Sequence, residues 1–331
     1  MRRGLWRAGR RGVARAIALP FVLLIGMAGY AGDQAPDSAG QDRDPGSFRI
    51  SVDVPLVVLH ATVTGRQGGF VSDLGQQDFA VYEDGAPQRI QLFRNEDIPV
   101  TVGLVIDHST TMAPKLVEVT AAARTFVRCS NRDDEMFVVN FNEEVSLGLP
   151  GAVRFSDSGA ELQHAILMAP AGGQTALYDA IYKALDELRA GSRDKKALIV
   201  VSDGGDNASA RSLAEVMKLA GQSSAAIYTI GLFDEQDPDR NPGVLKRLAQ
   251  ATGGQTFLPG QLSEVEHICE GIAKDIRHQY TIGYVPINRA RDGAHRAIRV
   301  VAREQGHGAL SVRTRTGYIA GGEPGPGGGG R

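Results

Sequence analysis

The sequence is poor in the residues that build the commonest metal and covalent-catalysis sites. It has two cysteines and seven histidines among 331 residues, and the histidines are scattered without the close spacing of a zinc site. It contains neither the Gly-x-Ser-x-Gly turn of serine hydrolases nor a Walker-type glycine-rich phosphate loop. A functional site in this chain is therefore to be sought among oxygen-bearing side chains.

Long apolar runs are also scarce, and the one extended stretch lies near the N-terminus, from Ala16 to Met27. It is shorter than the roughly 20 residues that span a bilayer, and Pro20 interrupts it. Six arginines precede it and small residues around Ala31 follow it, which is the order of a secretory signal peptide. We therefore predict that residues 1–31 are a signal peptide and that the protein is exported, to the periplasm, cell envelope or medium, without stable membrane insertion. An uncleaved membrane anchor is the alternative.

Removal of this segment makes the chain distinctly acidic. The formal net charge goes from −2 to −8, because six arginines are lost and no acidic residue precedes Asp33. An acidic protein argues against nucleic acid as the main partner. Between Arg289 and Arg315, however, seven arginines outnumber two acidic residues. These arginines form either a basic binding face or the solvated side of alternating strands.

The overall composition, 42% hydrophobic and 22% charged, is that of a soluble globular protein, and the length allows one large domain and a smaller one. Residues 32–46 are predicted to be a disordered linker. Over residues 47–97 the apolar residues alternate with polar ones, and Asp84-Gly85 is a strong hairpin signal. We assign residues 47–97 to a small antiparallel β module without recognisable chemistry.

From Val100 onward, strand-like and helix-like segments alternate. This pattern predicts an α/β fold with a doubly wound, mainly parallel sheet, which we place at residues 98–285. Strand patterning returns over residues 286–319, and these strands are expected to pack on the β module as an accessory antiparallel unit built from both flanks of the chain. Residues 320–331, mostly Gly and Pro, are predicted to be a disordered tail. Helices are predicted at 115–128, 176–188, 213–220, 243–251 and 262–277.

Two continuous apolar runs of the predicted sheet each lead into an aspartate, Asp107 and Asp203. Such runs are typical of central parallel strands, whose carboxyl ends meet at the ligand-binding edge of an open sheet. Two hydroxyl side chains closely follow Asp107, and a third segment supplies another. Two carboxylates and three hydroxyls are hard oxygen donors that suit Mg²⁺ or Mn²⁺ rather than zinc. The five candidate metal ligands are Asp107, Ser109, Thr111, Thr175 and Asp203.

These residues resemble the metal-ion-dependent adhesion site of von Willebrand factor A domains. Asp107, Ser109 and Thr111 match the family's Asp-x-Ser-x-Ser motif, although Thr111 stands where the family usually has serine. Thr175 and Asp203 match its later Thr and Asp. The resemblance spans roughly residues 98–285. Flanking segments such as residues 315–318 resemble a bacterial subgroup of secreted proteins built around this domain, the "VWFA-related" proteins.

The resemblance implies a binding function rather than an enzyme. By resemblance, Ser109 and Thr111 bind the ion directly, Thr175 binds it directly or through water, and the aspartates act largely through water. In the family a partner protein supplies an Asp or Glu carboxylate as the last ligand. It therefore implies an adhesion or scaffold module, and no nucleophile or general base accompanies the site in the sequence. Two alternatives are a non-catalytic subunit of an envelope enzyme or chelatase-like assembly complex, and a degenerate domain without metal.

Four further residues are candidates for supporting roles. Asp179 and Asp206 lie near the ligands in sequence and are assigned to supporting or helix-capping roles. Cys129 and Cys269 fall on the first and last helices, which are neighbours in the family's fold. In an exported chain they could form a disulfide, and two free thiols are the alternative. His108 is not read as part of a catalytic triad, because triad members converge from separate segments.

Overall fold

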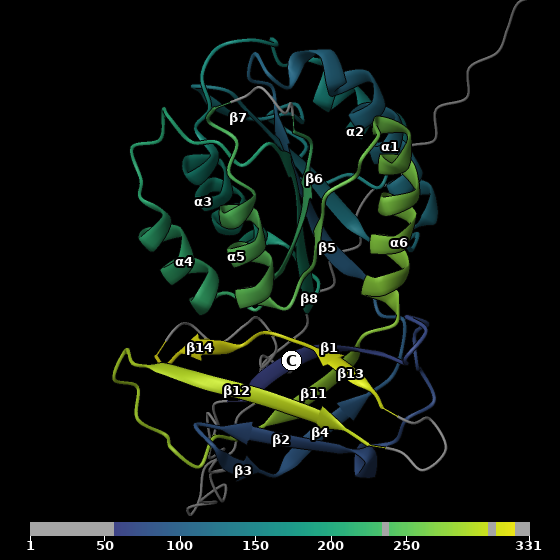
Figure 1. Ribbon diagram of the computed structural model, residues 1–331, viewed down its shortest axis with the longest axis vertical. Helices are drawn as coiled ribbons and strands as arrows, with labels where there is room; N and C mark the ends of the chain where they lie inside the picture. The colour runs from purple at the N-terminus through teal and green to yellow at the C-terminus, as the bar shows by residue number, and fades with distance from the viewer. Residues whose placement is uncertain (1–55, 234–237, 304–308, 322–331) are drawn as a thin grey trace, which may run out of the picture. The chain divides into compact units, whose positions relative to one another are not determined.

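The computed structural model describes residues 56–233, 238–303 and 309–321 (Figure 1). The predicted signal peptide, the predicted linker and nearly all of the predicted tail lie outside the described residues, as does the start of the β module. Among the described residues, no helix combines the length and the apolar character needed to cross a membrane.

A six-stranded sheet in the order β10-β9-β8-β5-β6-β7 forms the centre of the α/β part. Its strands are parallel except for β7, which pairs antiparallel with β6 at one edge. All residues of β5 and β8 are buried, as expected for central strands covered on both faces. The strands are β5 (Val100–Asp107), β6 (Glu135–Phe141), β7 (Val145–Leu147), β8 (Lys195–Ser202), β9 (Ala226–Gly231) and β10 (Thr256–Phe257).

Helices cover both faces of this sheet, with α1, α2 and α6 on one side and α3, α4 and α5 on the other (Figure 1). The fold is therefore the predicted doubly wound α/β fold. Local signals fix several helix ends: Ser212 forms a capping box with Glu215 at the start of α4, and α5 stops at Gly253, whose φ of +83° suits glycine. The helices are α1 (Leu116–Cys129), α2 (Gly159–Leu167), α3 (Leu177–Glu187), α4 (Leu213–Gln222), α5 (Pro242–Thr252) and α6 (Val265–Arg277).

Three short elements of the α/β part were not predicted from the sequence: α2 and the two edge strands β7 and β10. Each is brief, and the two strands have three and two residues, too few to show a period. Helix α2 did carry a sequence signal, because a serine followed three residues later by a glutamate is typical of the start of a helix. In the structure the Ser158 side chain accepts a hydrogen bond from the Glu161 N–H. The helix predicted at 115–128 begins at Leu116, after a 3-10 turn over Ala113–Lys115.

Two four-stranded antiparallel sheets flank the α/β part, in the orders β13-β1-β11-β4 and β14-β12-β2-β3. Both combine strands from the N-terminal and C-terminal flanks, as predicted. Apolar side chains of the two sheets form a second core that includes Leu59, Val81, Ile282 and Val300. The strands are β1 (Val57–Thr64), β2 (Phe79–Glu83), β3 (Ala86–Gln88), β4 (Ile90–Arg94), β11 (Tyr280–Tyr284), β12 (His295–Ala302), β13 (Ser311–Arg313) and β14 (Gly317–Ile319).

Strand β11 belongs to the flanking sheet, although the range predicted for the α/β domain runs to residue 285. It pairs with β1 and β4, and its tyrosines are bonded into the flanking core. The Tyr280 hydroxyl donates to the Val71 carbonyl at 2.8 Å, and the Tyr284 hydroxyl donates to Glu83 at 2.7 Å. The sequence boundary lay too far along the chain because α6 leads into β11 almost directly.

Cationic side chains cap the C-terminal ends of three helices at the amino edge of the central sheet. Arg313 donates to the Gly253 carbonyl after α5 at 2.6 Å, and Arg315 donates to the Gly221 carbonyl in α4 at 2.7 Å. Lys195 donates to the Ile276 carbonyl in α6 at 3.0 Å. Because the last carbonyls of a helix lack partners and carry partial negative charge, these cations stabilise the helix ends. Two of the three come from the C-terminal flank, which links that flank to the α/β part.

Candidate metal site

The candidate site lies where β5 and β8 end side by side. These strands are parallel neighbours, with Ile106 opposite Val201 in the register. Asp107 is the last residue of β5, and Asp203 directly follows β8. Adjacent parallel strands present their carboxyl ends at the same edge, which brings the two aspartates together as predicted from the sequence.

Asp107 is fully buried and is held at both carboxylate oxygens. Its Oδ1 accepts the Ser109 N–H at 2.8 Å, and its Oδ2 accepts the Ser202 hydroxyl at 2.6 Å. Burial raises the pKa of Asp107 to about 6, and nearby Asp203 adds to the rise while the serine hydrogen bonds oppose it. A carboxylate desolvated in this way beside a second carboxylate is stabilised by a cation.

The hydroxyls of Ser109 and Thr111, in the first loop of the site, which follows β5, lie between the two aspartates. Thr111 Oγ1 donates to Asp203 Oδ2 at 2.5 Å, and the hydroxyls of Ser109 and Thr111 are 3.3 Å apart. The other Asp203 oxygen accepts the Gly205 N–H at 3.0 Å. Four of the five predicted ligands, all but Thr175, are therefore connected through short polar contacts, and the threonine in place of the usual serine keeps its hydroxyl in the cluster.

Thr175 reaches the same edge on a third loop, between α2 and α3. Thr110 donates to the Gly173 carbonyl from both its N–H and its hydroxyl, at 3.2 and 3.1 Å, and Gly172 donates to the His108 carbonyl at 2.7 Å. Gly173 has a φ of +88°, a conformation that favours glycine. These bonds fasten the Thr175 loop to the first loop, and Thr175 itself is 7% exposed.

The loop after Asp203 depends on a second glycine. Gly204 has a φ of +80°, and a Cβ atom there would lie 2.4 Å from the Asn241 carbonyl oxygen. This close approach lets Asn241 donate its N–H to the Asp203 carbonyl at 3.0 Å. A larger residue at position 204 would push the two loops apart and displace Asp203.

Asp179 and Asp206 brace the surrounding loops, and neither is hydrogen-bonded to the five predicted ligands. Asp179 accepts bonds from the backbone of Ala210 and Arg211 and pairs with the Arg211 guanidinium at 3.1 Å. Asp206 accepts the Tyr178 N–H at 3.1 Å, near the start of α3, and the Ser209 hydroxyl at 2.5 Å. Asp206 is thus placed to cap α3, and Asp179 holds the loop before α4.

His108 lies beneath the site rather than in it. Its Nε2 is 3.1 Å from Asn140 Oδ1, and the Asn140 amide donates to the Ala165 carbonyl at 2.7 Å. Burial lowers the pKa of His108, and the Asn140 contact opposes that shift. This contact directs the His108 ring toward β6 and not toward Ser109. His108 and Ser109 are therefore not arranged as in a catalytic triad.

The donor set fits a hard divalent cation. No group of three or more His, Cys, Asp or Glu residues suited to a metal is found in the described part of the chain. An ion at this edge would therefore depend on hydroxyl oxygens beside Asp107 and Asp203, which suits Mg²⁺ or Mn²⁺ and not zinc. Neutral hydroxyls would leave the ion with residual positive charge.

The comparison with known families agrees with this geometry. Residues 102–205, which carry all five predicted ligands, match the von Willebrand factor type A domain. The chain contains a von Willebrand factor type A domain. No curated protein matches the sequence.

Several solved structures are similar to the chain at low identity. A von Willebrand factor type A protein from Catenulispora acidiphila is 14% identical, with a TM-score of 0.48, over 73% of each chain. The von Willebrand factor domain of the type V pili tip protein Mfa5 from Porphyromonas gingivalis is 15% identical, with a TM-score of 0.45, over 54% of this chain and 97% of that one. BatB from Bacteroides thetaiotaomicron is 17% identical, with a TM-score of 0.42, over 53% and 98%.

Two residues at the site were missed in the sequence. Ser202 holds Asp107 through its hydroxyl, which also accepts the Gly204 N–H at 3.0 Å. Asn207 holds the Thr175 loop. The position of Ser202 between an apolar run and Asp203 was a usable signal, because it predicts a hydroxyl at the carboxyl end of the strand. Nothing in the sequence indicated the role of Asn207.

Proposed function

We propose that this protein is an exported, non-enzymatic adhesion or scaffold module that binds a partner protein through Mg²⁺ or Mn²⁺. Asp107, Ser109, Thr111, Thr175 and Asp203 would hold the ion. The observation that carries the proposal is the convergence of four of these residues at the carboxyl edge of β5 and β8 within a von Willebrand factor type A domain.

The partner's contribution follows from charge. An ion held largely by neutral hydroxyls and water keeps positive charge and an open position, and a partner's Asp or Glu carboxylate satisfies both. The low dielectric of a docked interface strengthens that contact. When bound, the ion would supply this attraction, and the chain's own side chains would hold the ion in place.

Metal binding is tested by titrating the purified chain with Mg²⁺ in a calorimeter. Asp107→Ala is expected to abolish binding with the fold retained, because it removes the buried carboxylate at the centre of the cluster. Asp134→Ala is the matched control: Asp134 is also a buried aspartate, but it accepts bonds from Val100 and Asn131 at the opposite edge of the sheet. Unchanged Mg²⁺ affinity in Asp107→Ala would refute the metal site.

Partner binding is tested by capture from cell-envelope and culture-medium extracts with and without EDTA. A protein retained only in the presence of Mg²⁺ and lost in Ser109→Ala and Thr175→Ala is the expected result. Thr120→Ala makes the same chemical change on α1, where the buried hydroxyl donates to the Leu116 carbonyl, and should bind normally. A partner whose binding ignores EDTA and both site variants docks elsewhere on the molecule.

A further inference from the structure

Asn207 fixes the peptide groups of Thr175 from both sides. Its side-chain Oδ1 accepts the Thr175 N–H at 2.9 Å. The backbone N–H groups of Asn207 and Ala208 both donate to the Thr175 carbonyl, at 3.0 and 3.1 Å. The Thr175 backbone is therefore bonded to a single short segment, and the direction of its hydroxyl depends on where that segment lies.

The Asn207 amide also reaches the loop between β9 and α5. Its Nδ2 donates to Asp239 Oδ2 at 3.1 Å, and the loop that carries Asp239 also provides the Asn241 N–H bonded to the Asp203 carbonyl. One side chain thus connects the loops of Thr175, Asp203 and Asp239. An asparagine can do this because its amide offers an acceptor and a donor at a fixed angle.

We propose that Asn207 is a positioning residue of the candidate metal site, which sets the Thr175 hydroxyl relative to Asp203 without touching the ion. This inference rests on the proposed function. Groups that orient metal ligands through hydrogen bonds usually contribute about 10- to 100-fold to metal affinity. We therefore expect Asn207→Ala to weaken Mn²⁺ binding by about that factor.

The experiment measures Mn²⁺ affinity of the full chain by electron paramagnetic resonance, and thermal unfolding in EDTA. Asn131→Ala is the matched control, because Asn131 Oδ1 also accepts a backbone N–H, from Asp133 at 3.1 Å, but at the far edge of the sheet. Asn207→Ala and Asn131→Ala are both expected to unfold in EDTA near the wild-type temperature.

The outcomes separate this inference from the proposed function. If the wild type does not bind Mn²⁺, both fail. If the wild type binds and Asn207→Ala binds equally well, only the role of Asn207 is overturned. A loss of affinity matched by a large fall in the EDTA unfolding temperature, absent from Asn131→Ala, would assign Asn207 to folding instead.

Discussion

Lys195 is a buried cation whose protonation is coupled to folding. Its side chain is 1% exposed and caps α6. Burial lowers its pKa to about 8, with Asp97, Asp134 and Asp275 opposing the shift. Because the folded pKa lies below the unfolded value of 10.5, the folded state loses its proton first, and stability rises as pH increases from 8 to 10.5. The shift corresponds to about 3 kcal/mol.

We therefore predict that Lys195→Met removes this part of the pH dependence. The measurement is urea unfolding of the wild type and the variant across pH 8 to 10.5. The difference between the two free energies of unfolding isolates Lys195 from the other titratable groups of the chain. Lys218→Met, on the surface helix α4, is the control and should follow the wild type. Parallel curves for the wild type and Lys195→Met would contradict the prediction.

The ligand positions illustrate which side chains the sequence can place. Asp107 and Asp203 were predictable because each follows an apolar run, and a parallel sheet brings such strand ends to one edge. Ser109 and Thr111 follow from their short spacing to Asp107. Asn207 was not predictable, since its role arises from three loops whose relative positions depend on the fold.

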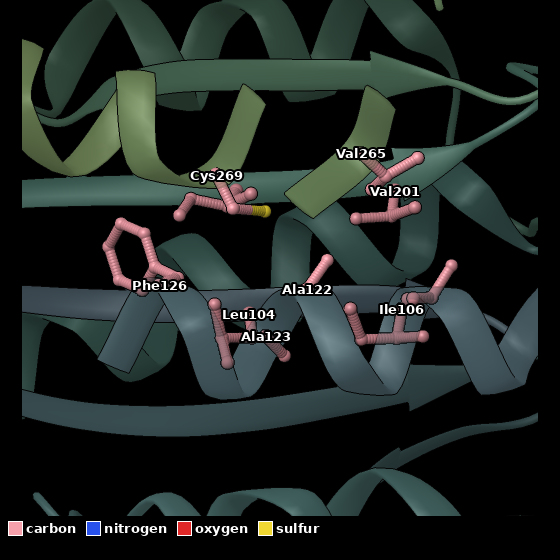
Figure 2. A pocket seen from close by; sticks show the side chains of 10 residues that line it. Leu104, Ile106, Ala122, Ala123, Phe126, Val201, Val265 and Cys269 are labelled. Atoms are coloured by element: carbon pink, nitrogen blue, oxygen red, sulfur yellow. The ribbon is translucent and has the colours of Figure 1, made fainter. Parts of the chain in front are cut away.

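Helices α1 and α6 pack against each other on one face of the sheet, and each carries one cysteine. Both cysteines are free thiols in the structure, with Cys269 buried and Cys129 half-buried. Cys269 lines a small apolar cavity between these helices and the sheet, beside Phe126 and Leu104 (Figure 2). Burial raises the pKa of Cys269 to about 12, with contributions from Glu266 and Cys129, which makes it a slow nucleophile.

We predict that the two cysteines pair under oxidising conditions and that the bond stabilises the protein. A disulfide closing so long a loop is worth up to about 4–5 kcal/mol in the chain-entropy estimate. Intact-mass analysis after alkylation of the unfolded, unreduced protein detects the loss of two hydrogens, and Cys129→Ser is the control that cannot form the bond. Quantitative alkylation of both thiols after oxidation would show that the helices hold the sulfur atoms apart.

The secondary-structure elements show the same division between predictable and unpredictable features. Long elements such as β5 and α6 were predicted because β5 is a continuous apolar run and the apolar residues of α6 recur at helical spacing. The strands β7 and β10 were missed since pairing with a neighbour, not local sequence, defines them. For α2, the cap at Ser158 was the available signal and the helix was too short to reinforce it.

The whole molecule is organised by the insertion of the α/β domain between two paired strands. Strand β4 precedes the domain and β11 follows it, and these strands pair antiparallel, with Phe93 opposite Ile282. The combination of N- and C-terminal flanks was predictable from their alternating patterns. The register was not, because strands far apart in sequence select partners through packing.

An ion pair joins the flanking sheet to this domain. The carboxylate of Asp275, on α6, is bonded to the Arg313 guanidinium of β13 and accepts the Thr62 hydroxyl of β1 at 2.6 Å. Asp275 is 3% exposed. Removing one partner of a buried pair leaves the other charge without compensation, which costs about 3–5 kcal/mol. Arg313→Met is therefore expected to destabilise the protein by an amount of that order.

The decisive measurement is a double-mutant cycle in urea. Asp275→Asn removes the charge that Arg313 compensates, so adding it to Arg313→Met should recover part of the lost stability. Arg128→Met is the control, because its pair with Glu266 at 3.7 Å joins side chains that are 67% and 55% exposed, and such pairs are worth less than about 1 kcal/mol. If Arg313→Met costs no more than Arg128→Met, the buried ion pair does not hold the flanking sheet to the domain. If it costs several times more and the cycle shows coupling, the C-terminal flank stabilises the domain that carries the candidate metal site.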